Sequence, residues 1–170
     1  MNKSWIIVIV VTVIGSISAF AVSPYFTEST IDEALPTGTI TQPKMDEKNE
    51  MMTDKIMTKK DETMTVSYSG TFIGVGDGIH NAQGMAFTVP IEDGSKVLRL
   101  ENFESTNGPD LFVYLATDDK ASDFISLGEL KANKGNQNYD IPNNVNLEKY
   151  NKVLIWCKAF GVLFGSAELS

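Results

Sequence analysis

Two side chains in this sequence of 170 residues have types suited to redox or metal chemistry, and each occurs only once: Cys157 and His80. A cysteine thiolate is a nucleophile and a soft metal ligand, and an imidazole titrates near neutral pH or ligates metals. One cysteine and one histidine are too few for a closed Cys/His zinc site, a three-histidine catalytic zinc or a two-histidine, one-cysteine copper site within one chain. They also exclude an intrachain disulfide and a C-x-x-C-H haem attachment.

The sequence around Cys157 predicts the direction of its side chain. Residues 152–158 form a strand pattern in which alternate residues share a face, so Val153, Ile155 and Cys157 should point to the same side. The thiol should therefore point inward or toward the rim of the domain. A free cysteine is commonly an inert part of a core, whereas redox or ligand function needs a reachable, partly ionised thiol. An intermolecular disulfide is a third option, which burial would forbid.

The histidine lies just after a turn. His80 follows Asp77-Gly78-Ile79 and stands at the start of a predicted strand. A histidine at a strand end can ligate iron or titrate near neutral pH. The more common role is an exposed side chain that bonds a neighbour, and Asp77 is near enough in sequence to be that neighbour. Because a histidine at this position can ligate iron, we consider His80 a second cofactor-binding candidate beside Cys157.

The charge of the chain excludes one class of partner. The sequence contains 14 basic and 22 acidic residues and has a formal net charge of −8. An acidic surface repels phosphate backbones, so we expect no nucleic-acid partner. Neither the Gly-x-Ser-x-Gly elbow of hydrolases nor an EF-hand calcium loop occurs in the sequence. The composition therefore does not favour a hydrolase or a dedicated calcium protein.

Residues 1–22 are predicted to be a transmembrane anchor or a signal peptide. The apolar run from Trp5 to Val22 is just long enough to span a bilayer as a helix. Ala19-Phe20-Ala21 offers a signal-peptidase site, but the run is longer than a typical signal core, so we favour the uncleaved anchor. Lys3 favours an N-terminus on the inside. In both interpretations the rest of the chain lies on the extracytoplasmic side, secreted if the segment is cleaved.

Residues 23–64 are predicted to be a disordered or partly helical stalk. Prolines and few large apolar residues characterise its first half, and the second half is highly charged. Five of the seven methionines lie in the second half: Met45, Met51, Met52, Met57 and Met64. Thioethers suit Cu(I), so a copper-collecting segment is one hypothesis. The irregular spacing, the lack of interleaved histidine and the ordinary use of methionine in helices favour a structural role instead.

Residues 65–170 are predicted to form one all-β domain with a net charge of −5. Short runs rich in Val, Ile, Phe and Tyr alternate with turn sequences such as Asp93-Gly94, and no stretch sustains a helical period. About eight antiparallel strands predict a β-sandwich or a barrel-like domain. The expected strands are Gly70–Val75, Ala82–Pro90, Ser95–Glu101, Leu111–Ala116, Phe124–Leu130, Asn136–Ile141, Lys152–Lys158 and Val162–Leu169.

Alternation within these strands predicts which side chains face the core, because successive residues of a strand point to opposite sides. Three further strands have a clear apolar face. Their expected inward residues are Met85, Phe87 and Val89; Leu98 and Leu100, opposite Arg99 and Glu101; and Leu111, Val113 and Leu115.

Three blocks of the last hundred residues, read together, resemble a known family. The first block runs from Gly70-Thr71-Phe72 to His80 and Gly84. The second runs from Leu98-Arg99-Leu100-Glu101-Asn102-Phe103 into Asn107-Gly108-Pro109-Asp110-Leu111-Phe112-Val113-Tyr114-Leu115. The third and most specific contains Asn138-Tyr139-Asp140-Ile141-Pro142, Tyr150, Val153-Leu154-Ile155-Trp156-Cys157-Lys158-Ala159-Phe160 and Phe164-Gly165-Ser166-Ala167-Glu168-Leu169. Over about Ser69 to Leu169 the chain resembles the DM-thirteen domain family.

The resemblance implies a β-sandwich domain that occurs elsewhere beside DOMON domains and takes part in extracellular electron transfer. It implies that the cysteine of the closing strand, Cys157 here, is the redox group, either as a bare thiol or as a ligand of haem or a metal. His80 falls where members of the family often have histidine, and it is the second candidate ligand. The sequence shows no DOMON or membrane cytochrome segment, so we expect a relay with an unknown redox partner rather than a stand-alone enzyme.

Two functions of different classes follow from these observations. The first is a membrane-anchored extracytoplasmic domain that transfers electrons through Cys157, with a cofactor that the sequence does not identify. The alternative is a non-enzymatic cell-surface binding module in which Cys157 is a buried structural residue. In that case the loops Asn107–Asp110 and Asp118–Asp123 would recognise a surface protein, since loops on a rigid sandwich commonly carry recognition.

Overall fold

The computed structural model describes residues 5, 7–14, 28–42, 63–64 and 68–170. Residues 7–14 are helical. Within the described parts of the chain, no helix combines the length and apolar composition that crossing a membrane requires, so the predicted transmembrane helix has no support there. The remainder of the predicted anchor and much of the predicted stalk, including Met45, Met51, Met52 and Met57, lie outside the described residues.

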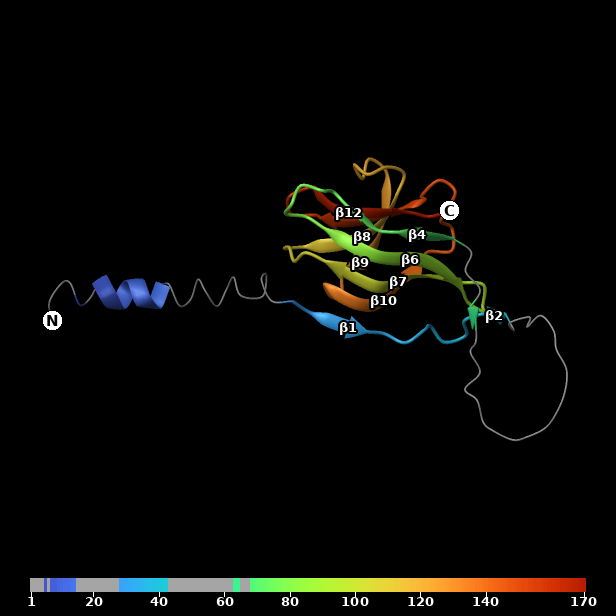
Figure 1. The fold of residues 1–170 in the computed structure, drawn as a ribbon, viewed down its shortest axis with the longest axis horizontal. Coiled ribbons are helices and arrows are strands. Elements are labelled where there is room, and N and C mark those ends of the chain that lie inside the picture. Colours follow the sequence, from blue (N-terminus) through green and yellow to red (C-terminus); the bar gives the residue numbers. More distant parts are fainter. Residues whose placement is uncertain (1–4, 6, 15–27, 43–62, 65–67) are drawn as a thin grey trace, which may run out of the picture.

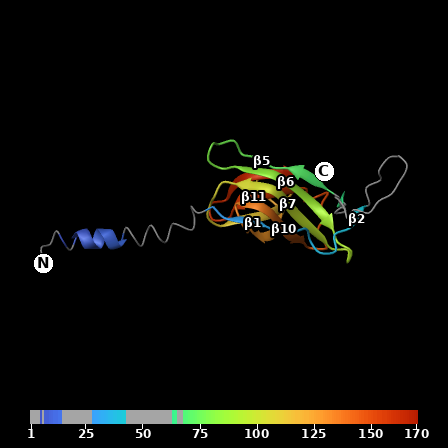
Figure 2. The same ribbon diagram turned by 60° about the horizontal axis from the view of Figure 1, so that its bottom comes forward.

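The domain is a sandwich of two five-stranded sheets, as Figures 1 and 2 show. The first sheet has the order β1 (Thr30–Asp32), β10 (Lys134–Ile141), β7 (Lys96–Ser105), β6 (Ala82–Pro90) and β4 (Ser69–Thr71). The second has the order β5 (Ile73–Gly74), β12 (Val162–Glu168), β11 (Lys152–Cys157), β8 (Leu111–Ala116) and β9 (Phe124–Glu129). Strands β2 (Thr41–Gln42) and β3 (Thr63–Met64) form a separate pair. The predicted all-β fold is therefore confirmed, in its sandwich form.

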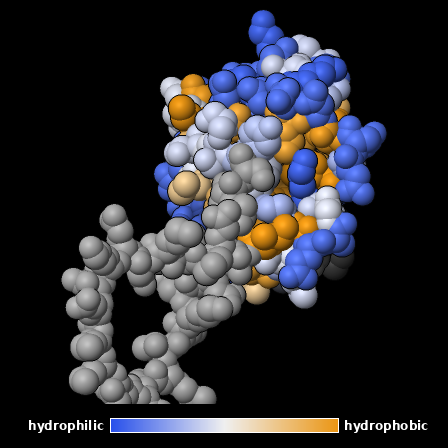
Figure 3. Space-filling model, turned by 90° about the vertical axis from the view of Figure 1, so that its right-hand side faces the viewer, coloured by the Kyte–Doolittle hydropathy of each residue, from blue (hydrophilic) through white to orange (hydrophobic). Residues whose placement is uncertain are grey.

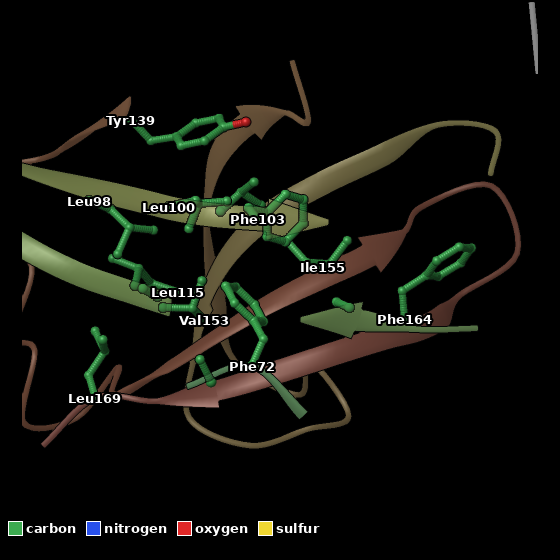
Figure 4. Packing of buried hydrophobic residues seen from close by; sticks show 14 of the residues in the cluster. Phe72, Leu98, Leu100, Phe103, Leu115, Tyr139, Val153, Ile155, Phe164 and Leu169 are labelled. Atoms are coloured by element: carbon green, nitrogen blue, oxygen red, sulfur yellow. The ribbon is translucent and has the colours of Figure 1, made fainter. Parts of the chain in front are cut away.

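Most strands lie where the turn sequences placed them, and β6 and β8 have the predicted bounds. The predicted strand Gly70–Val75 is instead two short strands. Strand β4 pairs with β6 in the first sheet, and β5 pairs with β12 in the second. The chain changes sheets at Phe72, whose ring is buried in the core between them (Figure 4).

Strand β1 lies in the segment predicted to be a stalk, and it pairs in parallel with β10. Side-chain contacts hold the residues that follow it against the first sheet. Arg99, which is buried, donates to the carbonyl oxygens of Glu33 (3.1 Å) and Ala34 (3.3 Å). The Glu33 carboxylate accepts bonds from Lys131 Nζ (2.8 Å) and from the backbone N–H of Asn138 (2.6 Å). The boundary between stalk and domain at residue 65 stays a prediction.

The main core fills the space between the two sheets, and Figure 4 shows the large side chains that meet there. The predicted inward faces of β7, β8 and β11 are confirmed, because their residues belong to this core cluster: Leu98, Leu100, Leu111, Val113, Leu115, Val153, Ile155 and Cys157. Alternate residues on β8 and β11 form a smaller apolar cluster on the outer face of the second sheet, with Tyr114 and Leu154 at its centre.

The predicted inward face of β6 is wrong. Ala82 and Ala86 belong to the core, while Met85 is 45% exposed. Phe87 and Val89 are buried on the opposite face, where they pair across strands with Arg99 and Val97. The side-chain pattern misled because this outer face is buried as well, and the segment after β1 bonds to the same sheet at Arg99 and Pro90. Large apolar residues on β6 therefore face away from the core.

We expect Gly135→Ala to detach β1. Gly135 has φ +105°, and a Cβ atom there would overlap the carbonyl oxygen of Ile31 in β1. Gly128 is a matched control, because it has φ +122° but nothing within 4 Å of an added Cβ atom. Gly128→Ala should lose only about 1–2 kcal/mol of stability, because it introduces backbone strain but no overlap. Gly135→Ala should lose more stability in chemical denaturation, together with the hydrogen-exchange protection of β1. Equal losses and a protected β1 would contradict this assignment.

Candidate functional site

The two sequence candidates, Cys157 and His80, line the same cavity of about 230 Å³ at one end of the sandwich. Three segments build its wall: the loop before β6, the loop before β8, and the end of β11 with the following turn and the start of β12. Their contributing residues are Ile79 and His80; Asn107, Gly108 and Pro109; and Cys157, Phe160, Val162 and Phe164. The fold thus brings together two residues that the sequence considered separately.

Cys157 is the last residue of β11 and is only 1% exposed. Its side chain points inward, as predicted, and its Sγ–H group donates to the carbonyl oxygen of Pro109 at 3.0 Å. A carbonyl can only accept, so this bond requires the protonated thiol. The neighbouring Lys158 turns away, because its Nζ lies 4.8 Å from the centre of the Phe112 ring on the outer face of the sheet.

Asp77 orients His80. Its Oδ2 lies 2.6 Å from His80 Nδ1, and its Oδ1 accepts the backbone N–H groups of Ile79 (2.8 Å) and His80 (2.7 Å). The partner predicted from the sequence is therefore confirmed. An ionised carboxylate can only accept, so Nδ1 carries the proton and Nε2 is left as the basic or ligand nitrogen. The backbone bond from His80, its imidazole and the N–H of Ile79 lower the pKa of Asp77 to about 2.

Phe164 lines the cavity next to His80, and the sequence analysis did not identify it as a site residue. Its ring meets the His80 ring edge to face, with centres 4.6 Å apart. Phe164 is the unpaired residue of a β-bulge between β11 and β12, since Ile155 pairs with Gly165 and Trp156 with Leu163. A Cβ atom at Gly108 would lie 2.6 Å from the Phe164 ring, so a larger residue there would have to displace the ring.

The rim of the cavity carries two large apolar side chains that the sequence analysis also did not identify. Ile79 is 71% exposed and Phe160 is 73% exposed. Both lie in connections between strands, where turn residues and polar side chains are usual. A bulky apolar residue inside a predicted turn was the available signal for a functional surface.

Of the two loops that the alternative function would use for recognition, one lines the cavity and the other does not. Asn107–Asp110 contributes one wall of the cavity. In the loop Asp118–Asp123 the acidic side chains stabilise the loop itself or its neighbours. Asp118 Oδ1 accepts the backbone N–H groups of Lys120 (2.9 Å) and Ser122 (3.1 Å), and Asp123 binds Lys149 Nζ (2.7 Å).

The haem and metal expectations do not fit the residues around this cavity. Its volume is below the range of about 300–1,000 Å³ that is typical of small-molecule sites, and it is too small to enclose a porphyrin. Among the described residues no group of three or more His, Cys, Asp or Glu side chains could hold a metal ion. Cys157 and His80 alone are fewer than the three or four protein ligands of zinc and copper sites. Among the residues that line this cavity, Cys157 has the one side chain that can itself be oxidised and reduced.

The fold and this site define a small two-sheet β-sandwich module with a single-thiol cavity at one end. A family model described as "Electron transfer DM13" matches residues 74–169, which include every residue of the cavity wall. The chain belongs to this electron-transfer family, as the resemblance indicated. Neither the search of curated proteins nor that of solved structures found a match.

We expect the loop at Asp77 to open in acid. The folded-state pKa of about 2 is below the ordinary value of 3.8, so the carboxylate stabilises the loop above pH 3.8. This contribution is lost as the pH falls from about 4 to 2. The amide signals of Ile79 and His80 should therefore titrate in NMR spectra with a midpoint near pH 2, and Asp77→Asn should abolish this transition. A midpoint near pH 4 would contradict the bonding described here.

Proposed function

We propose that the protein is an extracytoplasmic electron-transfer module, tethered to a membrane by residues 1–22, that uses Cys157 as its redox group. The observation that carries the proposal is the shared cavity, in which a buried thiol and a carboxylate-oriented imidazole face the same space. Membership of an electron-transfer family supports the redox role. The module acts as a relay between a donor and an acceptor.

The side chains of the N-terminal helix support the membrane tether. Trp5 and the apolar residues of 7–14 are between 44% and 68% exposed, on every side of the helix. A helix that is apolar all round is stable only where its whole surface is removed from water. The apolar sequence continues to Val22, so a bilayer is the environment that suits this segment.

The size of the cavity limits what can reach the sulfur. A volume of about 230 Å³ has room for several waters, since each takes about 30 Å³ in the liquid, and the 1% exposure of Cys157 keeps its sulfur below the protein surface. A small hydroperoxide is an oxidant of suitable size, and small thiols are the matching reductant. The burial of Cys157 prevents a disulfide between two copies of the protein.

The oxidising step moves two electrons from sulfur to the hydroperoxide. The thiol proton passes to His80 Nε2 through cavity water, and the thiolate attacks one peroxide oxygen. The S–O bond forms while the O–O bond breaks, and the leaving oxygen takes the proton from His80 and departs as water or an alcohol. The product is a sulfenic acid. Two small thiols then restore the Cys157 thiol as they become one disulfide and release one water.

The alternative, a binding module with a structural cysteine, is favoured by the burial of Cys157 and by the exposed Ile79 and Phe160 at the rim. The two functions differ in whether the native thiol can be reached. A binding module needs no path from solvent to sulfur, while a thiol relay requires one.

We expect a small methanethiosulfonate reagent to modify Cys157 in the native state, and a bulky aromatic disulfide to react much more slowly. Phe160→Ala should speed the reaction by widening the mouth of the cavity. Phe124→Ala is the matched control, because Phe124 is also an exposed aromatic residue but stacks on Tyr114 over the outer face of the second sheet. Modification only on unfolding would reject the relay and favour the binding module.

We also expect dilute hydrogen peroxide to produce a sulfenic acid at Cys157, detected by mass spectrometry after trapping with a cyclic diketone. The trap distinguishes this product from methionine sulfoxide. Cys157→Ser should give no adduct, and His80→Gln should slow its formation about tenfold or more, since a positioned base contributes about 10²–10⁴-fold. A protein whose thiol reacts with methanethiosulfonate but never with peroxide would disprove the proposed oxidation.

A further inference from the structure

The N-terminal segment joins the domain at the same end as the Cys157 cavity. Ser29 Oγ donates to Asn133 Oδ1 (3.2 Å) and accepts the backbone N–H of Asn133 (3.2 Å). Asn133 Nδ2 in turn donates to Oδ1 of Asn107 (3.3 Å), which lines the cavity. Lys134 Nζ lies 3.1 Å from carboxylate oxygens of both Glu28 and Glu104. Residues 28–29 are therefore bound beside the cavity wall.

From this point the chain runs away from the cavity. Strand β1 is parallel to β10, and the segment after it reaches the other end of the sandwich, where the Ile40 N–H donates to the Pro90 carbonyl (3.1 Å). Figures 1 and 2 show the loop between β5 and β6, which carries Ile79, at the end where β1 begins. Residues 43–64 come after residues 28–42, which contact the domain. They therefore do not lengthen the connection between the apolar segment and the domain.

The connection itself is short. Six residue steps separate Val22, the last residue of the apolar run, from Glu28, the first described residue at the domain. A fully extended chain covers at most about 3.3–3.6 Å per residue, so this distance is at most about 22 Å. A domain attached in this way keeps its cavity end near the bilayer surface.

The cavity end also has the surface that a membrane interface suits. Ile79 and Phe160 are both more than two-thirds exposed, and they flank the mouth of the cavity. Of the charges beside them, Asp77 binds His80 and Lys158 lies over the Phe112 ring. The domain as a whole is acidic, so its contact with a lipid surface would be apolar rather than electrostatic.

We propose that the cavity end of the domain faces the membrane and that Ile79 and Phe160 insert into its interfacial layer. The partner that this apolar rim binds is the surface of a neutral phospholipid bilayer. The inference rests on the tether of the proposed function, and it adds that Cys157 receives its reactants from the lipid side. The far end, seen in Figure 3, carries hydrophilic residues at the top and along the edges of this view with hydrophobic areas between them, and in this proposal it faces away from the membrane.

The test places a tryptophan at each end of the full chain, bound to phosphatidylcholine vesicles with brominated acyl chains. Phe160→Trp reports on the cavity rim. Asn144→Trp is the control, because this exposed residue follows β10 in a turn whose Pro142 and Asn143 lie beside Gly94 at the far end. After subtraction of the parent protein's fluorescence, we expect at least twofold quenching at position 160 and none at position 144. Circular dichroism confirms that both variants are folded.

Two failures are distinguishable. A chain that does not float with the vesicles overturns the tether and, with it, the orientation proposed here. A chain that floats, but shows no quenching at position 160 or stronger quenching at position 144, overturns the orientation alone. Quenching at position 160 that is lost when Ile79→Asp is added would support insertion of the rim.

Discussion

The burial of Val153 and Ile155 between the two sheets is the constraint on which the position of the sulfur depends. Both side chains are fully buried, and Cys157 continues the same face of β11. Strand β11 pairs with β12 on one side and β8 on the other, so its register is held from both edges. A slip by one residue would turn Lys152 and Lys158 into the core, at a large cost in desolvation. Core packing therefore determines where the thiol lies.

The cavity exists because three chain segments leave the sheets at the same end. The β-bulge at Phe164 turns an aromatic ring beneath His80, and Gly108 allows the loop before β8 to close on that ring. The carbonyl of Pro109 then meets the Cys157 thiol. Cys157 thus belongs both to the apolar core and to the cavity wall.

Local contacts were predictable from the sequence, and long-range ones were not. The bond between Asp77 and His80 spans three residues within one turn, so spacing alone indicated it. The meeting of His80 with Cys157 depends on how two loops close over the end of the sandwich, and no periodicity in the sequence encodes that. Strand β1 was missed because a short strand in a proline-containing segment has no alternation to detect. Side-chain bonds from Arg99 and to Glu33 help to hold it.

The parallel pairing of β1 with β10 has a mechanical consequence. A pull on residue 28 toward the cavity end acts along the axis of β1, because the strand starts there and points toward the opposite end. Its backbone bonds to β10 and the Arg99 bonds to Glu33 and Ala34 are then loaded in shear and share the force. Bonds loaded together resist tension better than bonds that peel apart in sequence. A pull on residue 28 would therefore be shared along the length of this junction and would not open its bonds one after another.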